Sequence, residues 1–303
     1  MFRSDTFSQT IVELYGERGR LWLSELPILL DALAASWELV VLPPFPSLTY
    51  HYVAPALQTN GESVVLKVGV PNPELLTEIA ALRFFDGRGA AHLIAADERR
   101  GALLIERLTP GTALHTLEPD DQTILAAALV MQQIWRPAPE QHPFPTIADW
   151  GKGLTHLRRT FDGGSGPFPA ALVDAVEWLY AKLERSSAPP AVLHGDLHQG
   201  NMLAARRMPW LAIDPKGVVG EPACETGALL RNPPPWRTLC ELACIMERRV
   251  YLLAEALGFE RERIAGWGLA QAVLSAWWSY EDHGHGWEEA LACAEALYRV
   301  VLR

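Results

Sequence analysis

The sequence predicts an α+β protein with a small, β-rich N-terminal lobe over residues 1–107 and a larger, mainly helical C-terminal lobe over residues 108–303. Short segments rich in β-branched and aromatic residues, which are typical of strands, are confined to the first third of the chain. Long apolar periodicities, which are typical of helices, fill the rest. The segment Thr109-Pro110-Gly111 separates the two patterns, and strands followed by helices indicate two lobes.

The N-terminal lobe is expected to contain an N-terminal helix and an antiparallel sheet. Residues 10–36 predict the helix, because apolar side chains recur there on one face. These side chains are Ile11, Leu14, Leu21, Leu26, Leu29, Leu30 and Leu33. Strands are expected at residues 39–42, 50–53, 63–68, 90–96 and 102–106, with a helix at 74–85 after the third strand. Asn60-Gly61 favours a hairpin turn between the second and third strands, since both residues tolerate positive φ.

The C-terminal lobe is expected to be mainly helical, with long apolar periodicities in four segments. These segments cover residues 120–135, 170–185, 236–257 and 264–301. Pro-rich joints interrupt them at residues 137–145, 189–190 and 233–235.

Composition narrows the range of partners. The formal net charge of −10 argues against nucleic-acid binding, because phosphate backbones need clustered Lys and Arg; it is compatible with a cationic ligand. The N-terminal residues lack the apolar core of a signal peptide, and the apolar stretch at 26–35 is broken by Pro27 and Asp31, so we expect no membrane segment. Four cysteines without a CxxC pair predict reduced thiols and a cytoplasmic protein. The oligomeric state is left open.

The chemistry is concentrated in residues 192–217. Two short apolar runs there each end in polar residues, with Asp196 and Asn201 after the first run and Asp214 after the second. Phosphoryl transfer needs such a set: a carboxylate for the incoming hydroxyl, then an amide and a second carboxylate for Mg²⁺. We therefore expect Asp196 to orient the acceptor hydroxyl and take its proton, and Asn201 and Asp214 to hold the metal.

A metal cluster is the alternative interpretation of this region. His194, Asp196 and His198 alternate along the loop, so they could share a face and hold zinc in a hydrolase. Asn201 and Asp214 then have no role. Otherwise we expect His194 to brace the loop through hydrogen bonds and His198 to pack within it. The downstream carboxylates Glu221 and Glu225 are expected to fix local structure.

These residues carry a resemblance to a known family. His194-Gly-Asp-Leu-His-Gln-Gly-Asn201 resembles the HGDxHxxN catalytic loop of the aminoglycoside phosphotransferase family, relatives of the protein kinases. Ile213-Asp-Pro-Lys-Gly-Val-Val-Gly-Glu-Pro222 resembles the metal-loop segment of the streptomycin 6-kinase and hydroxyurea phosphotransferase branch. The resemblance extends from about Gly19 to about Ala296 and includes Trp37-Glu-Leu39, Leu66-Lys67, Leu104-Ile-Glu-Arg-Leu108 and Ser279-Tyr-Glu-Asp282.

The resemblance implies a protein-kinase-like fold, ATP and Mg²⁺ as cofactors, and a small-molecule hydroxyl as the acceptor. It implies that Lys67 touches the α- and β-phosphates and is aimed by Glu78, with Glu74 one turn earlier as the alternative partner. It also implies that backbone groups of Glu106 and Leu108 hydrogen-bond adenine.

The loop expected to cover the phosphates, about residues 43–52, contains no glycine. Glycines let backbone amides approach phosphate closely, and prolines remove amides. Only Ser47 and Thr49 offer short hydroxyls there, so we expect Ser47 to contribute to nucleotide binding. The efficiency of turnover stays open, and a non-catalytic nucleotide-binding relative is one alternative.

Glu281 and Asp282 lie where the related kinases bind the acceptor. Paired carboxylates there suit guanidinium or ammonium groups, and a solvated helix end is the competing interpretation. The resemblance favours a streptomycin-like aminoglycoside as the acceptor. Hydroxyurea, or an unidentified metabolite alcohol or sugar, is the alternative.

Overall fold

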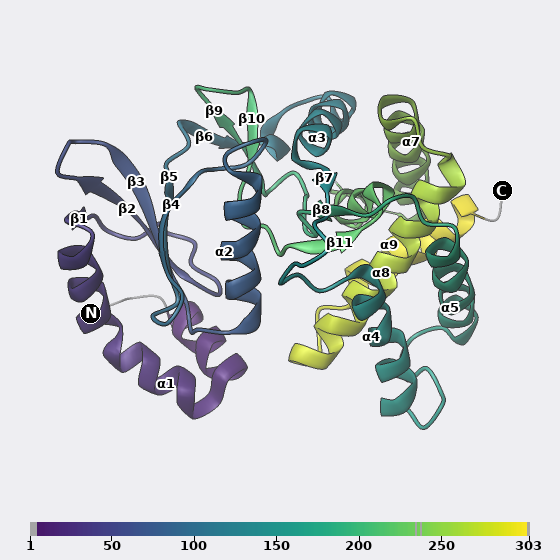
Figure 1. Ribbon diagram of the computed structural model, residues 1–303. Coiled ribbons are helices and arrows are strands. Elements are labelled where there is room, and N and C mark those ends of the chain that lie inside the picture. The colour runs from purple at the N-terminus through teal and green to yellow at the C-terminus, as the bar shows by residue number, and fades with distance from the viewer. Residues whose placement is uncertain (1–4, 234, 237, 302–303) are drawn as a thin grey trace. The chain divides into compact units, whose positions relative to one another are not determined.

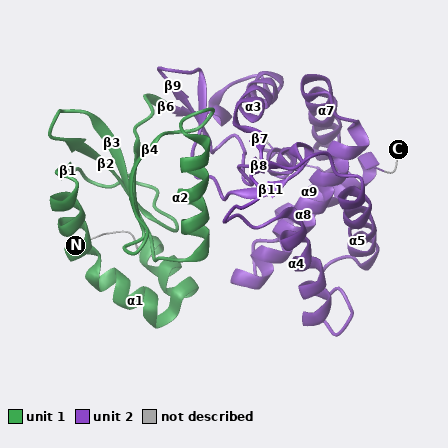
Figure 2. Cartoon of the chain, in the orientation of Figure 1, with its two compact units in different colours: residues 1–111 green, residues 112–303 purple. Residues whose placement is uncertain are grey.

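The structure is a computed structural model that describes residues 5–233, 235–236 and 238–301 (Figure 1). Pro234 of the predicted joint 233–235 and Arg237 of the predicted helix 236–257 lie outside the described residues. The chain forms two compact units, Met1–Gly111 and Thr112–Arg303, which Figure 2 colours separately. Each unit has its own core.

The first unit contains a five-stranded antiparallel sheet with the order β1-β2-β3-β5-β4. Its strands are β1 (Leu39–Val41), β2 (Tyr52–Gln58), β3 (Ser63–Val68), β4 (Leu93–Asp97) and β5 (Ala102–Glu106). The predicted hairpin is present, with Gly61 at φ +83°. The second strand runs to Gln58 rather than ending at Val53, because Tyr52, Ala54 and Ala56 alternate into the core.

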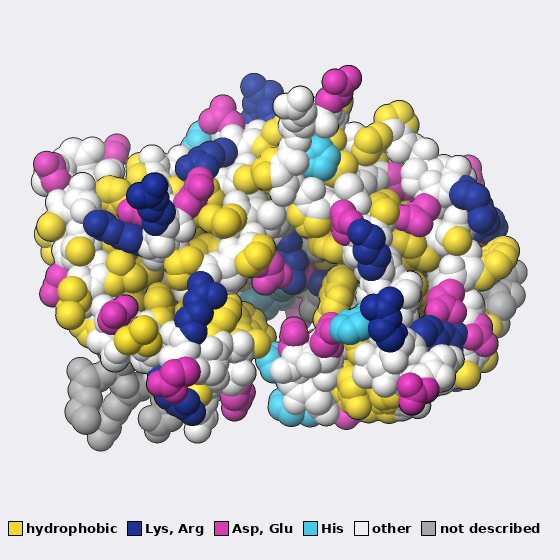
Figure 3. Space-filling view, turned by 60° about the horizontal axis from the view of Figure 1, so that its bottom comes forward, with side chains coloured by type: hydrophobic (Ala, Val, Ile, Leu, Met, Phe, Trp, Pro, Cys, Tyr) yellow, Lys and Arg dark blue, Asp and Glu magenta, His cyan; other side chains and the backbone are white. Residues whose placement is uncertain are grey.

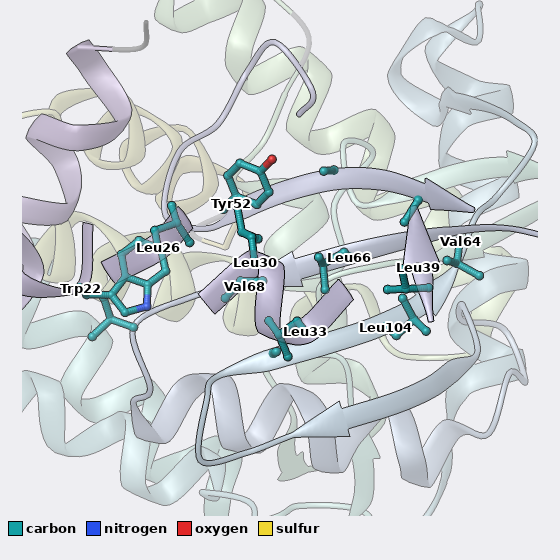
Figure 4. Close-up of a cluster of buried hydrophobic side chains, with 14 of the residues drawn as sticks. Trp22, Leu26, Leu30, Leu33, Leu39, Tyr52, Val64, Leu66, Val68 and Leu104 are labelled. Carbon is teal, nitrogen blue, oxygen red and sulfur yellow. The ribbon is translucent and has the colours of Figure 1, made fainter. Parts of the chain in front are cut away.

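Two helices cover the two faces of this sheet. Helix α1 (Asp5–Ser36) packs Leu26, Leu30 and Leu33 against one face (Figure 4), and α2 (Pro73–Phe85) packs Leu75, Ile79 and Leu82 against the other. The α2 helix begins where the Asn72 side chain accepts a hydrogen bond from the Leu75 N–H at 2.9 Å.

The predicted apolar stripe of α1 is wrong at one position. Leu21 is 58% exposed, and its neighbour Trp22 is buried in its place. The helix is kinked at Gly16, where φ is +57°. A left-handed residue rotates the helical faces on either side of it relative to each other, so one unbroken periodicity does not describe both halves.

The second unit is mainly helical. Its helices are α3 (Asp120–Ile134), α4 (Ile147–Thr160), α5 (Ala170–Arg185), α6 (Thr226–Leu230), α7 (Leu239–Leu257), α8 (Arg261–His283) and α9 (Glu288–Val301). Nearly every side chain of α8 from Ile264 to Trp277 is buried, because α4, α5, α6, α7 and α9 pack around it. The apolar periodicity at 264–301 is divided between two helices, since α8 ends at Gly284, which has a left-handed conformation.

Short strands position the polar loops of the second unit. One sheet has the order β10-β9-β6 and the other β11-β8-β7. Their strands are β6 (Pro110–Ala113), which crosses the boundary between the units, β7 (Arg136–Pro137), β8 (Ala191–Leu193), β9 (Met202–Ala205), β10 (Trp210–Ala212) and β11 (Val218–Gly220). The loop after β8 and the loop after β10 therefore carry the predicted chemistry. Among the described residues, no helix is long and apolar enough to cross a membrane.

Candidate active site

The loop of residues 194–201, between β8 and β9, is built around a buried imidazole. The His194 Nε2 atom lies 2.8 Å from the Ile213 carbonyl, and Nδ1 accepts a hydrogen bond from the Asp196 N–H at 3.2 Å. These partners assign the proton to Nε2. Burial lowers the pKa of His194 to about 4, so the ring is neutral at physiological pH. His194 braces the loop as predicted, and the zinc cluster is not formed: both ring nitrogens are engaged, and no group of three metal-binding side chains occurs among the described residues.

A buried carboxylate fixes the backbone of the same loop. Glu225 accepts hydrogen bonds from the N–H groups of His194, at 2.6 Å, and Gly195, at 2.8 Å. Gly195 has φ +84°, and a Cβ there would lie 2.9 Å from the Trp150 ring, so glycine is required. Burial raises the pKa of the Glu225 carboxyl to about 7, although the two N–H donors act in the opposite direction. The structural role predicted for Glu225 is confirmed.

Glu221 also has the structural role predicted for it. Its buried carboxylate accepts hydrogen bonds from the Arg263 guanidinium, from the Trp267 indole and from the Ala188 N–H. It thereby joins the segment after β11 to α8 and to the end of α5.

We expect Glu225→Gln to lower the free energy of unfolding by about 2 kcal/mol, because the amide nitrogen of glutamine would place its donors against one of the two backbone N–H groups that the carboxylate accepts. The pKa of Glu225 is raised on folding, so its stabilising contribution is full below the ordinary glutamate value and is lost as pH rises toward 7. The difference in unfolding free energy between wild type and variant should therefore shrink between pH 5 and pH 7. Urea denaturation across this range measures it, and a difference that grows with pH would contradict the assignment.

Asn201 links the two loops. Its side-chain Nδ2 donates to the Asp196 carbonyl at 3.0 Å, and its own carbonyl accepts from the Ile213 N–H at 2.9 Å. Its Oδ1 accepts no hydrogen bond from the residues that the structure describes. An amide oxygen held in this way is a suitable ligand for a hard cation.

Asp214 is the exposed carboxylate of the second loop. It adopts φ +57°, a left-handed conformation that aspartate tolerates better than most residues. Backbone hydrogen bonds fix the loop after Asp214, because the N–H groups of Lys216 and Gly217 donate to the His194 carbonyl at 2.8 and 3.1 Å. Carboxylate and amide oxygens are the ligand types that Mg²⁺ takes, with waters and substrate phosphates completing its shell. The residues present therefore fit a magnesium ion.

Asp196 has a partner that the sequence did not reveal. Its Oδ1 accepts a hydrogen bond from the Arg231 guanidinium, and both side chains are mostly buried. Burial alone would raise the pKa of Asp196, but Arg231, assisted by Lys216, lowers it to about 2. Asp196 is therefore ionised at physiological pH. Arg231 follows a short helix at the edge of a Pro-rich joint, where no local pattern marks it.

The first unit brings Lys67 and Glu78 together, and the predicted ion pair is confirmed. The Lys67 Nζ lies 2.7 Å from the Glu78 Oε1, and the two side chains are only 5% and 8% exposed. Strand β3 turns Lys67 toward the face that α2 covers, and Glu78 lies one turn beyond Glu74 on that helix.

We expect Lys67→Met to lower the free energy of unfolding by about 3 kcal/mol, because the buried Glu78 carboxylate would lose the ammonium group that lies 2.7 Å from it. The double variant Lys67→Met/Glu78→Met should be less destabilised than either single variant. The exposed pair Arg83–Glu98 of the same unit is the control, and Arg83→Met should cost about 0.5 kcal/mol. Equal losses for Lys67→Met and Arg83→Met in urea denaturation would contradict a buried, coupled pair.

The other predicted nucleotide contacts lie elsewhere in the first unit. Ser47 is exposed in the loop between β1 and β2. Glu106 ends β5, where its N–H donates to the His92 carbonyl at 2.9 Å, and Leu108 is buried. The Glu106 N–H is therefore already used within the protein. Contacts of these three residues with a nucleotide stay predictions.

The predicted acceptor residues lie at the C-terminal end of α8. Glu281 and Asp282 are both exposed, and the Glu281 Oε1 lies 2.7 Å from the His156 Nδ1 of α4. The sequence did not single out His156, whose α4 helix it also missed. An aromatic cluster that includes Trp277 and Tyr280 supports this end of α8.

The surface charge is mixed. On the face drawn in Figure 3, Lys and Arg are interspersed with Asp and Glu, and no broad basic area gathers among the described side chains. This face does not offer the clustered cations that a nucleic-acid backbone requires.

Comparisons with known proteins found similar proteins over most of the chain. A family model described as aminoglycoside/hydroxyurea antibiotic resistance kinase matches residues 46–283. Streptomycin 6-kinase of Streptomyces glaucescens is 33% identical over 290 residues, which cover 93% of this chain and 92% of that protein. Hydroxyurea phosphotransferase of Kitasatospora aureofaciens is 34% identical over 281 residues, which cover 88% of this chain and 77% of that protein.

Solved structures share the fold at low identity. Choline kinase LicA from Streptococcus pneumoniae has a TM-score of 0.64 at 13% identity, covering 92% of this chain and 99% of that chain. A thermostable mutant of aminoglycoside phosphotransferase APH(4)-Ia, in ternary complex with ADP and hygromycin B, has a TM-score of 0.62 at 15% identity, covering 90% of this chain and 97% of that chain. The predicted fold class, a protein-kinase-like fold with a small sheet-containing lobe and a larger helical lobe, is confirmed.

Proposed function

The chain belongs to the aminoglycoside/hydroxyurea antibiotic resistance kinase family, and from this premise we propose that it transfers the γ-phosphoryl group of ATP to a hydroxyl of streptomycin or a similar aminoglycoside. One observation carries the proposal. Asp196, Asn201 and Asp214 extend from two loops that share one hydrogen-bonded framework, in which Asn201 binds the backbone of both loops. This is the set that phosphoryl transfer requires.

In this proposal, the Asp196 carboxylate contacts the acceptor hydroxyl. The ionised carboxylate accepts the hydroxyl hydrogen bond, orients the oxygen for in-line attack and takes the proton as the new P–O bond forms. Its low pKa makes it a weak base, so orientation contributes more than early proton removal. Asn201 and Asp214 would hold Mg²⁺, which would supply positive charge to neutralise the phosphates. Lys67, aimed by Glu78, binds the phosphates.

The acceptor is cationic in this proposal. Glu281 and Asp282 provide exposed carboxylates at the end of α8, and carboxylates bind guanidinium and ammonium groups by charge-assisted hydrogen bonds. The net charge of −10 favours the approach of such a molecule. We place the reaction in the cytoplasm, where ATP is available and where the four unpaired cysteines stay reduced.

A screen of ADP release tests the proposal. The purified protein, with ATP and Mg²⁺, is offered streptomycin, other aminoglycosides, hydroxyurea, amino alcohols and sugars. Streptomycin should give the largest increase in ADP release, with phosphorylated product confirmed by mass spectrometry. Hydroxyurea is the second candidate, because a hydroxyurea phosphotransferase is 34% identical to the chain over 281 residues. No thermal stabilisation by millimolar ATP with Mg²⁺ would count against a kinase altogether.

A further inference from the structure

The Asp196 carboxylate is bound on one oxygen only. Its Oδ1 accepts a hydrogen bond from the Arg231 Nη2, and its Oδ2 accepts none from the residues that the structure describes. The two side chains are 12% and 22% exposed, so the ion pair is largely shielded from water. The bond to Oδ1 leaves Oδ2 as the oxygen that can meet an acceptor hydroxyl.

Arg231 is itself held from a second side. It caps α6, where its N–H donates to the Gly227 carbonyl at 3.0 Å. Its Nη1 lies 3.4 Å from the Oε1 of Gln271, a buried residue of α8. The Gln271 amide is anchored in turn, since its Nε2 donates to the Cys224 carbonyl at 2.6 Å. The guanidinium is therefore held between the loop and the central helix.

A second arginine fixes the backbone around Arg231. The Arg249 Nη1 donates to the carbonyls of Leu229, at 2.7 Å, and Asn232, at 3.0 Å, which lie on either side of Arg231 in the chain. Its Nε and Nη2 bind Asp120 at 3.0 and 2.7 Å. The Arg249 side chain is 1% exposed, and a buried guanidinium with every bond directed in this way holds its partners in one geometry.

The same segment contacts the catalytic loop directly. The Asn232 carbonyl also accepts a hydrogen bond from the side chain of Gln199, a residue between Asp196 and Asn201. The turn after α6 is thus bound both to α7 and to the loop that carries Asp196.

We propose that Arg231 is a positioning residue of phosphoryl transfer: it fixes the Asp196 carboxylate so that Oδ2 is presented to the acceptor, and the buried Arg249, paired with Asp120, holds Arg231 in place. The proposal rests on the proposed function, because it requires Asp196 to meet the acceptor hydroxyl. A carboxylate rotates easily about its terminal torsion. Transfer needs the reacting atoms within a fraction of an ångström of their productive places, so fixing this rotation raises the rate.

The chain contains a matched control for this relay. Arg248 and Arg249 are neighbours on α7, and they pair with the neighbours Asp121 and Asp120 on α3. Arg248 is 57% exposed and, among the residues that the structure describes, donates only to Asp121, whereas Arg249 is buried and also binds the segment around Arg231.

Steady-state kinetics with ATP and streptomycin test the proposal in the full chain. Arg231→Ala should lower kcat about 10²-fold with the KM for ATP changed less than about twofold, because the ATP-binding residues are untouched. Arg231→Lys should keep part of the rate, and millimolar methylguanidinium should restore part of the rate to Arg231→Ala but not raise that of the wild type. Arg249→Gln should lower kcat about tenfold, and Arg248→Gln should stay within about twofold of wild type.

Wild-type kcat in Arg231→Ala overturns the proposal, and so does a loss in Arg231→Ala that methylguanidinium does not restore. If Arg249→Gln does not fold, the kinetics of the Arg231 variants decide whether the proposal holds. If the wild-type protein is inactive with streptomycin, this result contradicts the proposed acceptor and not the proposed role of Arg231. Crystal structures of wild type and Arg231→Ala then test positioning: a reoriented Asp196 carboxylate supports it, and an unchanged one overturns it.

Discussion

Replacing Asp196 with alanine is expected to lower kcat about 10³-fold and to leave the dissociation constant of Mg·ATP nearly unchanged. The acceptor hydroxyl loses the group that orients it and takes its proton, while the metal and phosphate ligands remain. Removing the carboxylate also leaves the Arg231 guanidinium without its counter-charge, so ATP should bind as tightly as in wild type or more tightly. Single-turnover phosphoryl transfer and isothermal titration calorimetry with ATP measure the two quantities.

Asp196→Asn serves as the isosteric control. An amide oxygen can still accept the Arg231 hydrogen bond, so the loop keeps its geometry. The amide nitrogen then takes the place of Oδ2, and as a donor it can neither accept the hydrogen bond that orients the acceptor hydroxyl nor take the proton. Its kcat should therefore be as low as that of the alanine variant. Retained turnover in either variant would show that another group handles the acceptor hydroxyl.

The second large effect is expected at Asp214. Asp214→Asn should lower kcat/KM for Mg·ATP about 10³-fold, because the metal loses its charged protein ligand while asparagine still tolerates the left-handed backbone. Raising the Mg²⁺ concentration should recover part of the rate. Titration of activity with Mg²⁺ at fixed ATP gives the apparent metal affinity of each variant.

Asp162 provides the matching control, because it has φ +50° on an exposed turn after α4, outside the candidate site. Asp162→Asn should leave activity unchanged. Alanine at either position adds backbone strain of about 1 kcal/mol, so Asp162→Ala measures this strain separately from metal binding. If Asp214→Asn binds Mg·ATP as well as wild type, Asp214 is not the metal ligand.

The sequence revealed those residues of the site that lie close together along the chain. Asp196 and Asn201 lie in one loop of eight residues, residues 194–201, and Asp214 begins the next loop, so a strand–loop pattern is enough to bring them together. Arg231 and Arg249 were missed because their contacts are long-range. Arg249 binds Asp120 across 129 positions, and Arg231 binds Asp196 across 35. Such pairs depend on how helices pack, which no local pattern contains.

The sequence analysis also missed helix α4, because its local pattern is weak. The segment contains Gly151 and Gly153, and few apolar residues mark its buried face. A usable signal was present in the capping box, since Thr146 and Asp149 satisfy each other's backbone N–H groups. The buried helix α8 was predicted because its apolar residues are dense, but its end at Gly284 was not, because the apolar pattern resumes in α9.

The loop between β1 and β2 has a consequence for nucleotide binding beyond its lack of glycine. Pro43, Pro44 and Pro46 each restrict φ, and the N–H groups of Leu42 and Phe45 are bound to the β2 carbonyls of Pro55 and Val53. Such a segment has few conformations to lose when a ligand arrives, whereas a glycine-rich loop must be ordered. We expect the smaller entropic cost of ordering this loop to offset the weaker approach of its backbone to phosphate.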